Sequence, residues 1–201
     1  MSMFGASEES PRMFESDFVD AFSRTHFLAV PLLYVPAAAW LVYHAVFGLG
    51  MDWLVVLGLA AGGILAWTFT EYWLHRTFFH WEPDTWWGPK MHFFVHGVHH
   101  DWPRDRYRLV MPPAVSITLF FVFLGFWLLV AGDYGWAIHA GYVVGYMVYD
   151  LTHYYLHHGK PKSQYFKKLR RHHLSHHFNK RYQDRRYGVS TRLWDFVFRT
   201  T

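Results

Sequence analysis

The sequence predicts an all-α integral membrane protein, with four transmembrane helices and a helical cap outside the membrane. Three observations carry this prediction. Hydrophobic residues make up 52% of the 201 residues and charged residues only 17%, which excludes a charge-rich, disordered chain. The apolar residues gather in four long stretches, and Lys and Arg concentrate after the last one. The chain has 16 histidines and no cysteine, which excludes disulfides and thiolate metal sites.

Each apolar stretch approaches the roughly 20 residues that a helix needs to cross a bilayer. The first and third contain no charged residue, and in the second Glu71 lies at the very end. The fourth is interrupted by His139 and Asp150, and its Gly141 and Gly145 have the spacing that lets helices pack closely in lipid. The predicted spans are residues 27–47, 53–72, 114–131 and 136–155.

Polar segments flank and connect these spans. Residues 1–25 are interpreted as a polar N-terminal arm with an interfacial helix near 13–22, and residues 26–201 as a single domain. Within this domain, residues 75–111 and 159–201 are expected to form the cap.

The distribution of charge predicts the orientation. From residue 159 onward the chain has 12 Lys and Arg against 2 Asp and Glu, whereas the preceding part has 7 against 13. A basic segment directly after the last span is expected on the cytoplasmic side, and four spans place the whole cap there. This basic segment is more simply a topology and lipid-surface signal than a nucleic-acid site, so no nucleic-acid partner is expected.

Ten of the 16 histidines form a repeat of two copies. Each copy has a pair near the end of an even-numbered span, then a gap of 16 residues, then an H-x-x-H-H triad. Histidines at positions i, i+3 and i+4 share one face of a helix, so each triad presents three imidazoles in one direction. The five-residue spacing of the first pair predicts a helix end or distortion there. The copies are His75, His80, His96, His99 and His100, and His153, His157, His173, His176 and His177.

This repeat predicts a histidine-rich di-metal centre in the cap. Ten clustered imidazoles repel one another when several are protonated, unless they hold metal. Five imidazoles per ion exceed the four ligands of a structural zinc site and leave one octahedral position open, which favours iron and oxygen chemistry. Imidazole alone does not separate iron from zinc, copper or nickel. The spacing also leaves open whether each metal draws on one copy or on both.

Histidine ligands usually donate their second N–H to a carboxylate or a carbonyl oxygen. Four polar residues near the repeat are candidates for this supporting role, although each could equally be a helix cap or a solvated group. They are Glu71, Asp101, Asp150 and Asn179. The adjacent His92, His158 and His172 are interpreted as supporting residues rather than ligands.

Residues 71–80 (EYWLHRTFFH) resemble the first histidine box of the fatty acid hydroxylase superfamily of integral-membrane oxygenases. Within it, other segments are more similar to the fatty acid 2-hydroxylases that act on sphingolipid acyl chains. The RLVMPP element at 108–113 separates this group from sterol desaturases and carotenoid hydroxylases. The similar segments are 96–113 (HGVHHDWPRDRYRLVMPP), 149–158 (YDLTHYYLHH), 172–178 (HHLSHHF) and 187–198 (YGVSTRLWDFVF).

The resemblance implies hydroxylation at C2 of a long-chain fatty acid or of the acyl chain of a (dihydro)ceramide, using O2 and two electrons. It also implies that the ten histidines of the repeat hold two iron ions, which zinc can replace in purified protein. Tyr107 and Arg108 are candidates for polar contacts to this membrane lipid substrate.

Fungal and animal relatives carry an N-terminal cytochrome b5 domain, for which this chain is expected to have no room. The resemblance therefore implies a separate electron donor, such as a cytochrome b5 or a ferredoxin with its reductase. A basic surface suits an acidic redox partner and suits lipid headgroups equally well. Its residues are Lys167, Lys168, Arg170 and Arg171.

The expected location is a multi-pass membrane protein with a cytoplasmic active site, in the endoplasmic reticulum of a eukaryote or the inner membrane of a bacterium. Two alternatives stay open. The first is sterol or carotenoid oxidation within the same superfamily. The second is a non-enzymatic membrane metal-binding protein, which predicts ligands near the bilayer midplane, whereas these histidines follow the span ends.

Overall fold

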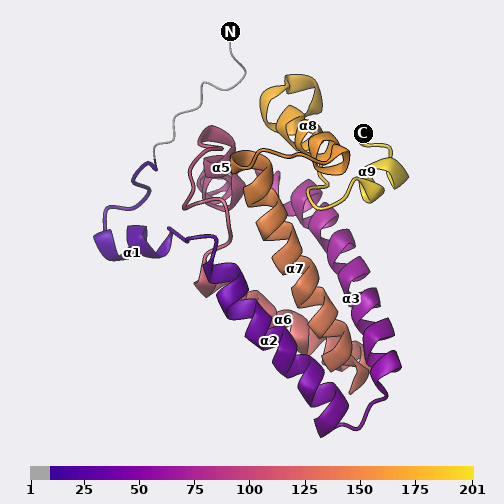
Figure 1. The fold of residues 1–201 in the computed structure, drawn as a ribbon. Helices are drawn as coiled ribbons and strands as arrows, with labels where there is room; N and C mark the ends of the chain where they lie inside the picture. The colour runs from indigo at the N-terminus through magenta and orange to yellow at the C-terminus, as the bar shows by residue number, and fades with distance from the viewer. Residues whose placement is uncertain (1–9) are drawn as a thin grey trace.

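The computed structural model describes residues 10–201, and all regular structure in that part is helical (Figure 1). Within residues 10–201, three helical stretches are long and apolar enough to cross a membrane. They coincide with the first three of the four expected spans. The first joins α2 (Ala29–Tyr43) to a π-helical turn, η1 (His44–Gly48), the second joins α3 (Trp53–Trp73) to the π-helix η2 (Leu74–Phe79), and the third is α6 (Pro113–Ala131).

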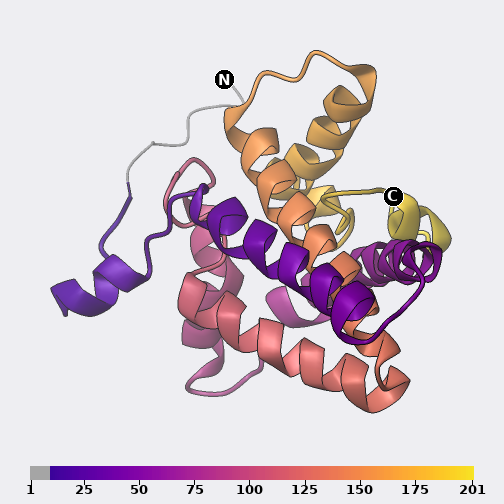
Figure 2. The same ribbon diagram turned by 60° about the horizontal axis from the view of Figure 1, so that its bottom comes forward.

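The fourth long helix, α7 (Tyr134–His158), is the centre of the bundle. It packs against α2, α3 and α6, and Figures 1 and 2 show it between them. Its polar residues His139, Asp150 and His153 are all buried, so their side chains face the interior of the protein. This polarity is why α7 falls outside the set of helices that are apolar enough to span a membrane by composition.

The outer helices expose their apolar side chains. On α6 the buried residues are Ser116 and Leu124, whereas Leu129 is 86% exposed. A continuous apolar surface of this kind is unfavourable in water and favourable against lipid. The protein is therefore a membrane protein.

Glycines bring the backbones of α3 and α7 into contact. A Cβ atom at Gly63 would lie 2.0 Å from the carbonyl oxygen of Ile138, and one at Gly141 would lie 1.8 Å from that of Ala60. Without hydrophobic driving force in lipid, helices associate through such close packing. This confirms the role expected of the glycine spacing on the fourth span.

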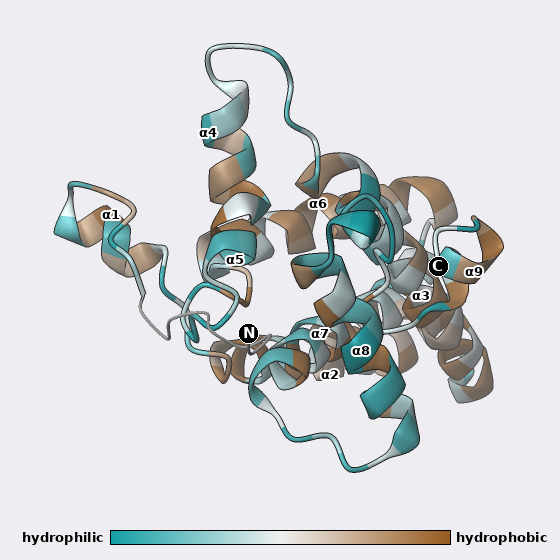
Figure 3. Ribbon diagram, turned by 90° about the horizontal axis from the view of Figure 1, so that it is seen from above, coloured by the Kyte–Doolittle hydropathy of each residue, from teal (hydrophilic) through white to brown (hydrophobic). Residues whose placement is uncertain are grey.

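The cap lies at one end of the bundle, where α3 and α7 end (Figure 1). Figure 3, the view from above, shows α8 as largely hydrophilic and α3 and α6 as largely hydrophobic. The elements of the cap come from the polar segments that follow α3 and α7. They are α4 (Gly88–His92), the π-helix η3 (Phe93–Gly97), α5 (Val98–Asp101), α8 (Gln164–Phe178), the short 3-10 helix η4 (Lys180–Tyr182) and α9 (Leu193–Val197).

A short helix, α1 (Asp17–Phe22), precedes the first span and stands beside the bundle (Figure 1). It lies within the stretch expected to form an interfacial helix, and its Phe18 and Phe22 are exposed. The first nine residues of the expected N-terminal arm lie outside the described part of the chain.

The contact between α3 and α7 can be tested with one added methyl group. Gly141→Ala forces the two helices apart, and we expect it to lower the free energy of unfolding by about 1–3 kcal/mol. Gly62→Ala is the matched control on α3, since a Cβ there meets nothing within 4 Å. Thermal unfolding in detergent measures both variants, and equal midpoints would contradict the proposed contact.

Candidate metal centre

All ten histidines of the repeat converge in two groups of five. Within each group, one ring nitrogen from every histidine lies within 4.8 Å of the others. The first group comprises His75, His80, His96, His100 and His176, and the second comprises His99, His153, His157, His173 and His177.

Each group contains four histidines of one sequence copy and one histidine of the other. In each H-x-x-H-H triad, the first and third histidines join the pair of their own copy, and the middle one joins the other group. His176 thereby enters the first group and His99 enters the second. Each group therefore draws on both copies, which answers the question that the spacing left open.

The five-residue spacing of the first pair matches a local change of helix type. His75 lies within the π-helix η2, and His80 is its C-terminal cap. A π-helix closes its hydrogen bonds between residues i and i+5, so residues five apart come together on one side. The expected distortion is confirmed, and it brings the rings of His75 and His80 to a centroid distance of 5.1 Å.

Neighbouring Nε2 atoms lie as close as ligands around one ion. In the first group the separations are 3.1 Å for His75–His96, 3.0 Å for His96–His100 and 3.0 Å for His80–His176. In the second group they are 2.8 Å for His157–His173 and 3.1 Å for His173–His177. Ligands at right angles around an ion at a metal–nitrogen distance of about 2.1 Å are about 3.0 Å apart, whereas tetrahedral ligands are about 3.4 Å apart. These five nitrogen pairs therefore have the spacing of neighbouring ligands at right angles around one ion.

Backbone carbonyls orient two histidines of the first group. The Nδ1–H of His75 donates to the carbonyl oxygen of Tyr187 at 2.6 Å, and that of His176 donates to the carbonyl oxygen of Arg185 at 2.7 Å. Each bond leaves Nε2 free as a ligand. In the second group, several ring nitrogens are buried without a hydrogen-bond partner in the described chain: both nitrogens of His153, one of which is its ligand atom, and Nδ1 of His173 and of His177.

The cap keeps its imidazoles neutral, which is the form that binds metal. Burial, which disfavours the charged form, lowers the pKa of His80 and of His99 to about 3. It also holds the pKa of His96, His173 and His177 well below the ordinary value, and the charges of neighbouring histidines act in the same direction.

The four candidate supporting residues lie near the centre but bond elsewhere. Glu71 accepts hydrogen bonds from the amides of Val189 and Ser190, at 2.6 and 2.8 Å, and from the Ser190 hydroxyl. Asp150 accepts from the amide of Met111 at 3.4 Å. These two carboxylates tie cap segments to α3 and α7.

The other two candidates lie at helix ends. Asp101 is exposed at the end of α5, and the Asn179 side chain accepts a hydrogen bond from the amide of Arg181. The Nδ1–H groups of His75 and His176 donate to backbone carbonyl oxygens instead. Sequence reasoning missed these carbonyls, because a side-chain pattern does not mark them.

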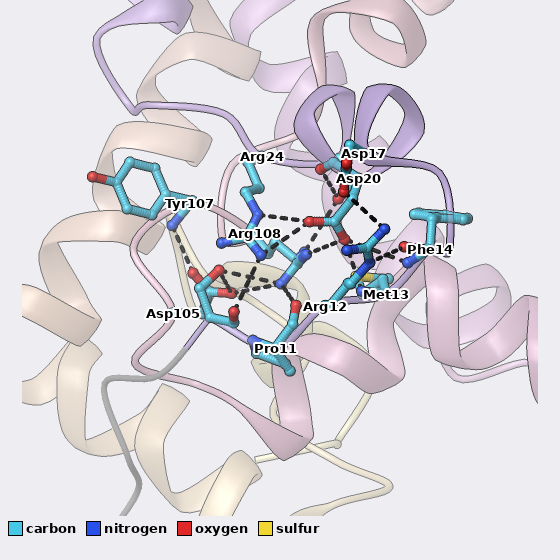
Figure 4. Close-up of polar contacts among 12 residues, drawn as sticks. Pro11, Arg12, Met13, Phe14, Asp17, Asp20, Arg24, Asp105, Tyr107 and Arg108 are labelled. Carbon is cyan, nitrogen blue, oxygen red and sulfur yellow. Dashed lines mark hydrogen bonds and ion pairs between the residues drawn. The ribbon is translucent and has the colours of Figure 1, made fainter.

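Arg108, a candidate substrate contact, is buried and already paired (Figure 4). Its guanidinium donates to Asp20 at 2.9 Å and to Asp105 at 3.2 Å, and also to the carbonyl oxygen of Pro11. It thereby fastens the N-terminal arm to the cap. Tyr107 is 45% exposed.

Fold and site together define a helical membrane protein with a candidate two-metal histidine centre. A family profile described as "Fatty acid hydroxylase" matches residues 60–200. The chain belongs to this family and is an enzyme.

Named relatives cover nearly the whole chain. The dihydroceramide fatty acyl 2-hydroxylase FAH1 of Arabidopsis thaliana is 39% identical over 97% of this chain and 81% of its own length. The fatty acid 2-hydroxylase of Mus musculus is 39% identical over 94% of this chain, which spans 56% of that relative. The solved structure described as full-length scs7p, with only the hydroxylase domain visible, has a TM-score of 0.84 and 34% identity. It covers 92% of this chain and 69% of its own.

The docking of the N-terminal arm has a testable pH dependence. Hydrogen bonds from the Met13 amide and from Arg24, with the nearby Arg108, lower the pKa of Asp20 to about 2. Because the unfolded carboxyl titrates near 3.8, this contribution is present above that pH and is lost as the pH falls through about 2.

Asp20→Asn removes the charge at every pH, so we expect faster amide hydrogen exchange in residues 10–24 already at neutral pH. Asp17→Asn is the control, since the Asp17 side chain is 92% exposed in its pair with Arg12. Equal exchange in both variants would contradict the role given to Asp20.

Proposed function

We propose that this chain is an O2-dependent di-iron hydroxylase that introduces a hydroxyl group at C2 of an acyl chain. The substrate is a long-chain fatty acid or the acyl chain of a (dihydro)ceramide or other sphingolipid. The observation that carries the proposal is the pair of five-histidine groups at the end of a membrane bundle. The relatives named as fatty acid and dihydroceramide fatty acyl 2-hydroxylases support the substrate and the position.

The first group of histidines holds one iron ion and the second group holds the other, and zinc can take the same nitrogens in purified protein. When bound, the iron pair supplies the reductive activation of O2, which no side chain can perform. The chain's own contribution is to hold ten neutral imidazoles in place. His75 and His176 do so through their bonds to backbone carbonyls.

A small apolar cavity of about 30 Å³ lies inside the bundle, and we propose that it is the inner end of a passage that opens around the acyl chain. It lies among α2, α3, α6 and α7, and it is bounded toward the cap by Leu74 and Met111. Met111 is also bonded to Asp150, one turn before His153. An acyl chain that opens this cavity would be shielded from water by its apolar lining. Its lining includes Tyr34, Trp67, Phe120, Phe123, Tyr142 and Tyr146.

Tyr107 and Arg108, the two candidate substrate contacts, differ in how accessible their side chains are. Tyr107 is free to meet a polar headgroup at the cap surface. Arg108 can bind a substrate carboxyl or headgroup only if it gives up its ion pair with Asp20 or with Asp105. Glu71 and Asp150 support the centre through the cap segments that they bind, and Asp101 and Asn179, at helix ends, stay candidates for the same role.

We assign α7 as the fourth span and the cap to the cytoplasmic side. Polar residues are tolerated inside a membrane when they face the interior of the bundle, and those of α7 are buried. The basic segment after α7 supports the orientation. The enzyme is then a multi-pass protein of the endoplasmic reticulum in a eukaryote or of the inner membrane in a bacterium. Residues 1–25 form the arm and 26–201 the hydroxylase domain.

Electrons come from a separate donor, such as a cytochrome b5 or a ferredoxin with its reductase. Lys167, Lys168 and Arg171 are exposed on α8 and offer a basic surface at the cap. An acidic redox partner would be steered to it by charge.

Expression in a host without 2-hydroxylated lipids tests the proposal. With iron and a donor supplied, mass spectrometry should detect 2-hydroxy acyl chains for the unmodified chain. His99→Ala removes a ligand of the second group, and we expect a loss on the order of 100-fold or more. His26→Gln, at an exposed histidine outside both groups, should keep full activity. Unmodified acyl chains with both metals bound would overturn the proposal, and new sterol or carotenoid products would identify a different substrate.

A further inference from the structure

Asp195 is a fully buried carboxylate outside both histidine groups. Its Oδ1 accepts hydrogen bonds from the amide of Tyr187 at 2.9 Å and from the hydroxyl of Thr200 at 2.7 Å. Its Oδ2 accepts from the amide of Gly188 at 2.8 Å and from Nε2 of His172 at 2.9 Å. Four donors converge on this one side chain, and only a carboxylate can accept all of them.

The segment that Asp195 holds is the one that orients the first histidine group. The amide of Tyr187 binds Asp195, while its carbonyl oxygen accepts the Nδ1–H of His75. Two residues earlier, the carbonyl oxygen of Arg185 accepts the Nδ1–H of His176. Both histidines belong to the first group. The second group has no comparable bond to this segment among the described residues.

The backbone between these two carbonyls has an uncommon conformation. Arg186 has φ of 62°, in the left-handed region, which is sparsely populated for residues other than glycine. Its amide donates to the carbonyl oxygen of Thr200 at 2.8 Å, and its guanidinium donates to the hydroxyl of Ser175 at 2.6 Å. Such a conformation persists only where its surroundings determine it.

Residues 185–188 pack directly against the carboxylate of Asp195. A Cβ atom at Gly188 would approach Oδ2 of Asp195 to 2.8 Å and the carbonyl oxygen of Thr191 to 2.0 Å. The position of residues 185–188 is therefore coupled to that of Asp195.

We propose that Asp195 is a positioning residue for one of the two metal ions. It fixes residues 185–188, whose carbonyls orient His75 and His176, and so it sets the metal affinity of the first group and not of the second. This inference rests on the proposed di-metal function.

Asp195→Asn tests it, because the amide has the same shape but turns two of its acceptor sites into donors that face N–H and O–H groups. The metal content of the purified full chain is measured after dialysis against increasing chelator. The unmodified chain should retain two ions, and the variant should lose one at a chelator strength about 10–100-fold lower. Phe196→Ala is the matched control on α9, since Phe196 is 77% exposed and should leave both ions in place.

Ligand variants identify which ion is affected. In a His153→Ala background, which disables the second group, Asp195→Asn should weaken the remaining ion. In a His80→Ala background, which disables the first group, it should leave the remaining ion unchanged. Equal weakening in the two backgrounds, or no weakening in either, would overturn the proposal.

A milder variant covers the case in which Asp195→Asn does not fold. Thr200→Val removes one of the four donors, and we expect a smaller loss of affinity confined to the same ion. Full retention of both ions in that variant, with Asp195→Asn unfolded, would make Asp195 a structural residue only. A failure of the proposed function has a different signature, because the unmodified chain itself would then not bind two ions or not hydroxylate with both bound.

Discussion

Ten imidazoles in contact with one another are stable only while they are neutral, and much of the fold keeps them in that state. Burial lowers the pKa of His80 and of His99 to about 3. Neutral nitrogens about 3 Å apart are then available to a metal and costly to leave together without one. The close contact of α3 and α7, through Gly63 and Gly141, brings the two sequence copies side by side where these helices end.

The exchange of His99 and His176 joins the copies into one centre. Neither copy can complete its group alone, so the cap between α3 and α6 and the cap after α7 must assemble together. Two buried carboxylates fasten this assembly: Glu71 binds Val189 and Ser190, and Asp195 binds Tyr187 and Gly188. The C-terminal segment is thus part of the centre, although it contributes no metal-binding histidine beyond α8.

The sequence predicts much of this arrangement because spacing carries geometric information. The repeat contains all ten histidines of the two groups, and the five-residue gap from His75 to His80 predicts a helix end or distortion, which the structure shows as the π-helix η2. The exchange was not predictable, because the choice of group for the middle histidine of each triad depends on how α5 faces α8. The carbonyls of Arg185 and Tyr187 were equally hidden, since every residue has one. Polar residues keep α7 from qualifying as a span by composition, and their burial explains how the fold accommodates them.

The central claim is that each metal is bound by histidines from both copies. Anomalous scattering from crystals of the metal-loaded protein tests it most directly, because it locates each ion among its ligands. We expect two peaks, one contacted by His176 together with the other four histidines of the first group, and the other contacted by His99 together with the other four of the second group. A single peak, or two peaks each surrounded by one copy alone, would contradict it.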